Sequence, residues 1–118
     1  MIRRSFVGAA GLVLALAWGS AMSAQDAAVE KGKKVYDSAT PKCKICHAIG
    51  GVGNAKGSLD EVGSKLKAED VKAWMRTPKE MAAKAKSERK PPMLAYPPDK
   101  LSDEDLTSLT AYLLSLKK

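Results

Sequence analysis

The segment CKICH at residues 43–47 constrains this chain more than any other feature of its sequence. It contains both cysteines and the single histidine of the 118 residues. The spacing C-x-x-C-H is the attachment signature of a c-type haem. The two thiols each add to a vinyl group of the porphyrin, and the histidine that follows binds the iron. The motif predicts a chain built around one covalently attached haem c, with Cys43 and Cys46 as attachment points and His47 as iron ligand.

Three other interpretations of the motif have less support. A structural zinc site needs four protein ligands, and the chain offers no second pair of cysteines or histidines. A thioredoxin-like redox pair is expected beside a βαβ pattern, which this sequence lacks. A disulfide between Cys43 and Cys46 would suit an oxidising compartment, but it would leave His47 without a role.

Residues 1–24 have the pattern of a secretory signal peptide. Two arginines precede an apolar stretch that ends at Trp18, and small residues follow. The apolar stretch is short for a membrane-spanning helix, which needs about 20 residues. We therefore expect the signal peptide to be cleaved near Ala24. The mature protein is then a single domain of residues 25–118, located in the periplasm. An uncleaved leader would instead tether the protein to the membrane.

The chain has an excess of basic residues. The formal net charge is +7, and loss of the two leader arginines leaves 18 basic residues against 13 acidic ones, or +5. Most of the basic residues are lysines, which are typical of an ordinary solvated surface. The same excess would also steer the protein toward acidic partners. Nucleic acid is a poor candidate, because no basic stretch is interleaved with aromatic residues.

Hydrophobic spacing predicts an all-α domain with about four short helices and no convincing strand. The last helix has the clearest amphipathic pattern, with leucines at 3-4-3 spacing after a Ser102 N-cap. A capping box is expected at Thr77, followed by Pro78 at the first helical position. A glycine-rich loop covers residues 50–63, and a proline-rich loop covers residues 87–100. The expected helices cover residues 27–39, 68–76, 77–86 and 102–116.

The second axial ligand of the iron has to be something other than histidine, because His47 is the only one. The candidates for this position are methionine, lysine, water or no ligand at all. Methionine is the usual partner of histidine in electron-transfer cytochromes. Met75 and Met81 fall on expected helices, where filling the core is their ordinary role. Met93 lies in PPMLAYP, whose prolines stiffen the backbone, so we expect Met93 to bind the iron.

The mature chain resembles a class I monohaem cytochrome c of the small bacterial type. The resemblance rests on CKICH, on PPMLAYP and on the C-terminal helix that carries leucines and a tyrosine. It implies the small cytochrome c fold, in which the first and last helices cross through a small residue and aromatics. Gly32, Tyr36 and Tyr112 match those roles. In cytochromes c′ the haem motif lies near the C-terminus, so its early position here argues against that gas-binding class.

The resemblance also implies contacts of the haem. The family often has Gly-Pro-x-Leu after the motif, and a backbone carbonyl there accepts a hydrogen bond from the axial histidine. This chain has Gly57-Ser58-Leu59 instead, so the carbonyl of Ser58 or a neighbour is expected to take that role. Leu59 is expected to pack on the haem face. Trp74 resembles the tryptophan that donates to a haem propionate, with plain core packing as the alternative.

These features predict a soluble, monomeric carrier of one electron at a time. The expected partners are redox proteins with acidic docking surfaces, with no nucleic acid and no small-molecule substrate. The protein is expected not to be an enzyme, since histidine and methionine together leave the iron no open position. One alternative is a haem enzyme or gas sensor with an open sixth site. Another is a haem-free thiol oxidoreductase.

Overall fold

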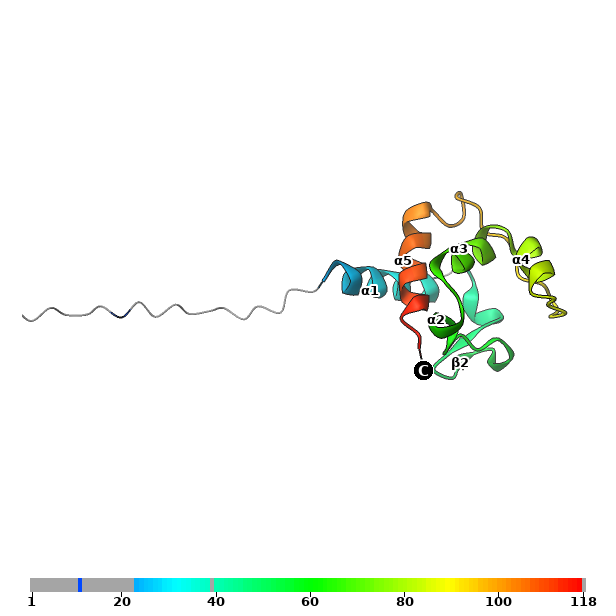
Figure 1. Ribbon diagram of the computed structural model, residues 1–118, viewed down its shortest axis with the longest axis horizontal. Helices are drawn as coiled ribbons and strands as arrows, with labels where there is room; N and C mark the ends of the chain where they lie inside the picture. The colour runs from blue at the N-terminus through cyan, green and yellow to red at the C-terminus, as the bar shows by residue number, and fades with distance from the viewer. Residues whose placement is uncertain (1–10, 12–22, 39, 118) are drawn as a thin grey trace, which may run out of the picture.

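The computed structural model describes residues 11, 23–38 and 40–117 (Figure 1). This part of the chain is a small, mainly helical domain, which confirms the predicted fold class. No helix within it is long and apolar enough to cross a membrane. The predicted signal peptide falls almost wholly outside the described residues. In chain order the elements are α1 (Ala24–Asp37), η1 (Cys43–Ile45), β1 (Ala48–Ile49), β2 (Val52–Gly53), η2 (Ala55–Gly57), α2 (Val62–Lys65), α3 (Ala68–Arg76), α4 (Pro78–Lys84) and α5 (Asp103–Leu114).

Helices α1 and α5 cross at close range and form the frame of the domain (Figure 1). The crossing requires glycine at position 32, because a Cβ there would lie 2.6 Å from the Cβ of Tyr112 and would overlap the backbone of Ser108. One turn further along α1, the ring of Tyr36 meets that of Tyr112 at a centroid distance of 6.0 Å and a tilt of 58°. The contact implied by Gly32, Tyr36 and Tyr112 is therefore present in the structure.

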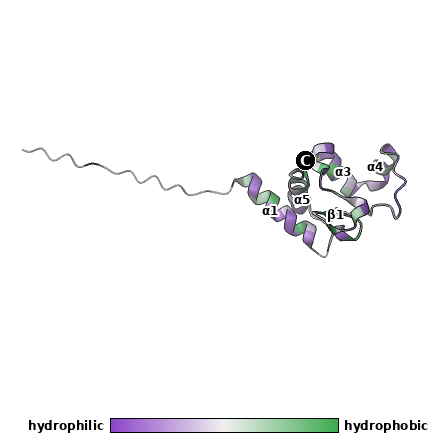
Figure 2. Ribbon diagram, turned by 90° about the horizontal axis from the view of Figure 1, so that it is seen from below, coloured by the Kyte–Doolittle hydropathy of each residue, from purple (hydrophilic) through white to green (hydrophobic). Residues whose placement is uncertain are grey.

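The hydrophobic core lies between α5 and the helices around it. Helix α5 begins as expected, with the Ser102 hydroxyl accepting from the backbone N–H of Asp105 at 3.1 Å. Along α1, hydrophobic and hydrophilic residues alternate in the manner of an amphipathic helix (Figure 2). The buried core residues are Tyr36, Val62, Val71, Met75, Leu101, Leu106, Leu109, Tyr112 and Leu113.

The glycine-rich segment between residues 50 and 63 has more structure than the sequence predicts. Strands β1 and β2 form a two-residue antiparallel hairpin. Gly50 and Gly51 connect them with φ angles of +59° and +81°, and a two-residue hairpin turn with both central φ angles positive favours glycine. The segment continues into η2, and the short helix α2 begins at Val62. The expectation of an unstructured loop without strands was therefore wrong for this segment.

Helix α3 has the predicted bounds, but the predicted capping box at the start of α4 is wrong. The Thr77 hydroxyl donates back to the carbonyl of Ala73 at 3.1 Å, and so it is not available to cap the next helix. Pro78 does occupy the first turn of α4, as expected. Helix α4 ends at Lys84, and Lys86 adopts a left-handed φ of +51° just after it.

The proline-rich loop after α4 is fastened to the core at its C-terminal side by Arg76. Its Nη1 donates to the carbonyls of Tyr96, at 2.6 Å, and Leu101, at 2.7 Å. Its Nη2 pairs with a carboxylate oxygen of Asp103 at 2.7 Å. The N–H of Tyr96 also donates to the carbonyl of Met75 at 2.8 Å. One arginine at the end of α3 thus joins this loop to the start of α5.

Candidate haem-binding site

A cavity of about 300 Å³ opens into the domain, at the lower end of the range for small-molecule sites. Its wall is mostly apolar and comes from η1, from helices α1 to α5 and from the proline-rich loop. All six residues that the sequence predicts for the site line this one cavity. They are Cys43, Cys46, His47, Leu59, Trp74 and Met93. Residues as far apart in the chain as Cys43 and Met93 therefore converge on one apolar space.

The haem motif takes a compact local structure. Residues Cys43–Ile45 form the single turn η1, and the N–H groups of Cys46 and His47 both donate to the carbonyl of Cys43, at 3.2 and 2.9 Å. This turn brings the two thiols and the imidazole to the same wall. Burial raises the pKa of Cys43 to about 11, so that this thiol is uncharged at neutral pH.

His47 is oriented by a backbone carbonyl. Its Nδ1 lies 2.9 Å from the carbonyl oxygen of Gly57. Because a carbonyl only accepts, Nδ1 carries the hydrogen and Nε2 keeps its lone pair for a metal. Burial lowers the pKa of His47, an effect that the Gly57 hydrogen bond opposes and nearby Arg89 reinforces. The neutral imidazole is the form that binds iron.

The acceptor carbonyl therefore belongs to Gly57, the neighbour of Ser58. The segment is held in place from both sides, since the N–H of Asn54 donates to the His47 carbonyl at 3.0 Å and that of Leu59 to the Ala48 carbonyl at 2.9 Å. A Cβ at position 57 would overlap the Cys46 carbonyl and the guanidinium of Arg89. The position is thus confined to glycine by close approach.

Leu59 and Trp74 both line the cavity, and their contact with the haem stays a prediction. Leu59 is half-buried and packs against the core. Trp74 is also half-buried, and its indole N–H donates to no residue within the described part of the chain. The propionate contact of Trp74 stays a prediction.

Two methionines line the cavity, Met75 and Met93, and Met81 is not among the residues of its wall. Met75 is only 4% exposed and belongs to the core cluster, whereas Met93 is half-buried on the proline-rich loop. Both side chains therefore border the space that the haem would take.

The residues of the cavity fit a covalently attached haem. The wall is apolar, two thiols stand at attachment spacing, and an imidazole nitrogen is free to bind iron. The hydroxyl of Tyr36 is buried at the cavity with no hydrogen-bond partner among the described residues, which leaves it able to meet a polar atom of a bound group or water. When bound, the haem supplies an iron that changes oxidation state by one electron.

Sequence reasoning missed Arg89, which also lines the cavity. Its Nη2 donates to the carbonyl of Cys46. The available signal was compositional: Arg76 and Arg89 are the two arginines of residues 25–118, in a stretch whose other basic residues are lysines. Periodicity and motif spacing carry no information on such a contact, since 43 residues separate its partners.

A mainly helical fold around an apolar cavity with a C-x-x-C-H turn defines a c-type haem protein. The family profile described as "Cytochrome c" matches residues 29–117. The chain belongs to the cytochrome c family, and its cofactor is a covalently attached haem c, with which the pair Cys43 and Cys46 agrees. Haem-based electron transfer is the function that this family assignment supports.

The chain is also similar to "Cytochrome c oxidase subunit 2" of Alkalihalophilus pseudofirmus. The identity is 31% over 115 residues, which cover 86% of this chain and 31% of that protein. The chain thus spans about a third of the length of this curated relative. No solved structure gives a significant match.

Proposed function

We propose that this protein is a one-electron carrier whose haem iron is bound by His47 and Met93. The observation that carries the proposal is the convergence of His47, Met93 and both thiols on one apolar cavity. The His47 imidazole donates its Nδ1 hydrogen to the Gly57 carbonyl, so its Nε2 is a suitable ligand for one side of the iron. A thioether is a soft ligand that favours the reduced iron and raises the potential.

Met93 is a better ligand candidate than Met75 for reasons of packing. Met75 fills the core among Tyr36, Val71 and Leu109, so moving its sulfur toward iron would leave a cavity behind. Met93 lies on a loop that is stiffened by prolines and is fastened by Arg76 at the carbonyl of Tyr96. A loop side chain held in this way can face the iron without loss of core packing.

With two protein ligands on the iron, no position stays open for a substrate or a gas. Electron transfer needs only a rigid ligand set and an accessible haem edge, and we therefore propose a carrier and not an enzyme. The alternative is a haem enzyme or gas sensor with an open sixth site, which requires that Met93 does not bind.

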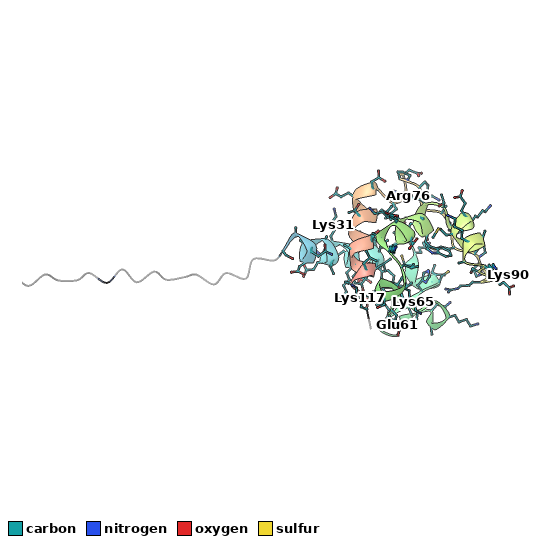
Figure 3. The ribbon with its side chains drawn as sticks, viewed as in Figure 1. Lys31, Glu61, Lys65, Arg76, Lys90 and Lys117 are labelled. Carbon is teal, nitrogen blue, oxygen red and sulfur yellow. The ribbon has the colours of Figure 1, made fainter. Side chains whose placement is uncertain are left out.

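The partners that we propose are redox proteins with acidic docking surfaces. The basis is the net charge of +5 beyond the leader, together with lysines spread over the surface of the domain (Figure 3). Similarity to part of a cytochrome c oxidase subunit 2 supports electron exchange with an oxidase of that kind. Together with the leader pattern, this similarity supports a location outside the cytoplasm, and we propose that the protein is a monomer in the periplasm.

One set of absorption spectra tests the proposal. The purified protein in its oxidised and reduced states should show a low-spin haem, with a sulfur–iron charge-transfer band in the oxidised state. The reduced protein should not bind carbon monoxide readily. A high-spin spectrum together with rapid binding of carbon monoxide would favour the open-site alternative. A colourless protein after loading and acid-acetone extraction would contradict covalent haem.

A further inference from the structure

Both arginines of residues 25–118 hold the loop that carries Met93, Arg76 from helix α3 and Arg89 from within the loop. Arg76 holds its C-terminal side through the carbonyls of Tyr96 and Leu101. Arg89 stands four residues before Met93, and its Nη2 donates to the carbonyl of Cys46. The loop is therefore fastened on either side of Met93, and each time by a guanidinium.

Arg89 connects the segments of the two proposed iron ligands directly. Its acceptor, Cys46, immediately precedes His47 and carries one of the thiols. Its guanidinium also lies against Gly57, whose carbonyl accepts from the His47 ring. One side chain thus joins the Met93 side of the cavity to the backbone that orients His47.

The rest of the segment before Met93 has little to hold it. Every residue from 83 to 92 is exposed. The buried residue of the preceding helix α4 is Pro78, at the start of that helix. Segments with few buried contacts open at low free-energy cost. A charge-assisted hydrogen bond is among the stronger ties that an exposed segment can make. Loss of the Arg89 bond should therefore release this segment more than loss of any neighbouring side chain.

We propose that Arg89 is a positioning residue that holds the Met93 loop closed over the haem by tying it to the Cys46 carbonyl. The proposal rests on the proposed ligation by Met93. Arg89 does not touch the iron; it sets how often the loop lifts the sulfur away and admits another ligand.

The test is imidazole binding to the oxidised, haem-loaded protein, because imidazole enters only when the sulfur leaves. Arg89→Met removes the charge and every donor while keeping an apolar side chain. We expect its imidazole association constant to rise about tenfold over wild type, equivalent to about 1.4 kcal/mol. Arg89→Lys keeps the charge and N–H donors on a single nitrogen, so its imidazole association constant should lie between those of wild type and Arg89→Met.

Lys90→Met is the matched control, since it removes one positive charge from the adjacent exposed position of the same segment (Figure 3). It should bind imidazole as wild type does. Equal increases in Arg89→Met and Lys90→Met would overturn the proposal in favour of a general charge effect. An unchanged imidazole affinity in Arg89→Met would also overturn the proposal. If the pH dependence of the midpoint potential changes in that variant while the imidazole affinity does not, Arg89 would instead be assigned to a haem propionate.

Failure of the proposed ligation gives a different result. If the wild type lacks the sulfur–iron band before any imidazole is added, then Met93 is not a ligand and the proposed function fails first. If the wild type has the band and the Arg89 variants behave as wild type, only the role of Arg89 is wrong.

Discussion

The Nδ1 atom of His47 donates to the carbonyl oxygen of Gly57 at 2.9 Å, across ten residues of chain. The contact fixes the tautomer and the plane of the imidazole before any iron binds. It depends on a close approach at position 57, where the Cys46 carbonyl and the Arg89 side chain leave no room for a Cβ. Glycine here thus serves the orientation of the axial ligand.

Gly57→Ala should disturb this contact and destabilise the domain. The added Cβ must push aside either the Cys46 backbone or the Arg89 side chain, and overpacking of this kind costs about 1–3 kcal/mol. Chemical denaturation of the haem-loaded protein measures the loss in the free energy of unfolding. Lys56→Ala changes the exposed neighbouring residue and should have little effect. Equal stability of the two variants would show that the backbone has more room than the structure gives it.

Met93→Ala should remove the sulfur–iron charge-transfer band of the oxidised protein and lower its midpoint potential, because the thioether favours the reduced iron. The vacated position should then accept water, a lysine or added carbon monoxide. Absorption spectra and a redox titration measure both effects.

Met75→Leu and Met81→Leu are the controls for this experiment. They exchange similar volumes and should keep the band, at a cost below about 1.5 kcal/mol. Loss of the band in Met75→Leu, with its survival in Met93→Ala, would assign the ligand to Met75, whose side chain also borders the cavity.

The double variant Cys43→Ala/Cys46→Ala should carry no covalent haem and should fold poorly. An empty apolar cavity at the centre of a small domain leaves its lining without packing partners. Two measurements test this. Acid-acetone extraction shows how much haem stays with the protein, and circular dichroism gives its helical content. Normal yield of covalently bound haem in this variant would contradict attachment at the motif.

Electron transfer to an acidic partner should slow as the salt concentration rises. Screening shortens the reach of charge–charge attraction to about 8 Å at 0.15 M, so the steering by surface lysines fades. Stopped-flow rates with a purified acidic acceptor, measured over a salt series, test this. Rates that do not vary with salt would leave the lysines as solubilising surface only.

Several features of the fold follow from local sequence, and the structure agrees with them. Helix α3 occupies the predicted residues, and Ser102 caps α5 as expected, because a helix start depends on residues three or four positions apart. The crossing through Gly32 follows from the family resemblance and from the absence of a side chain. The prediction of a capping box at Thr77 was wrong because the Thr77 hydroxyl donates to the Ala73 carbonyl in the preceding turn.

By itself the sequence determined the cofactor, because C-x-x-C-H puts all the attachment chemistry into five consecutive residues. It also placed Cys43, Cys46, His47 and Met93 on the list of site residues. Only the tertiary structure decided which carbonyl holds His47, that Met75 borders the same cavity, and that two arginines fasten the Met93 loop. These contacts join residues 10 to 43 positions apart, and such distances are bridged by packing of the whole chain and not by any periodicity within it.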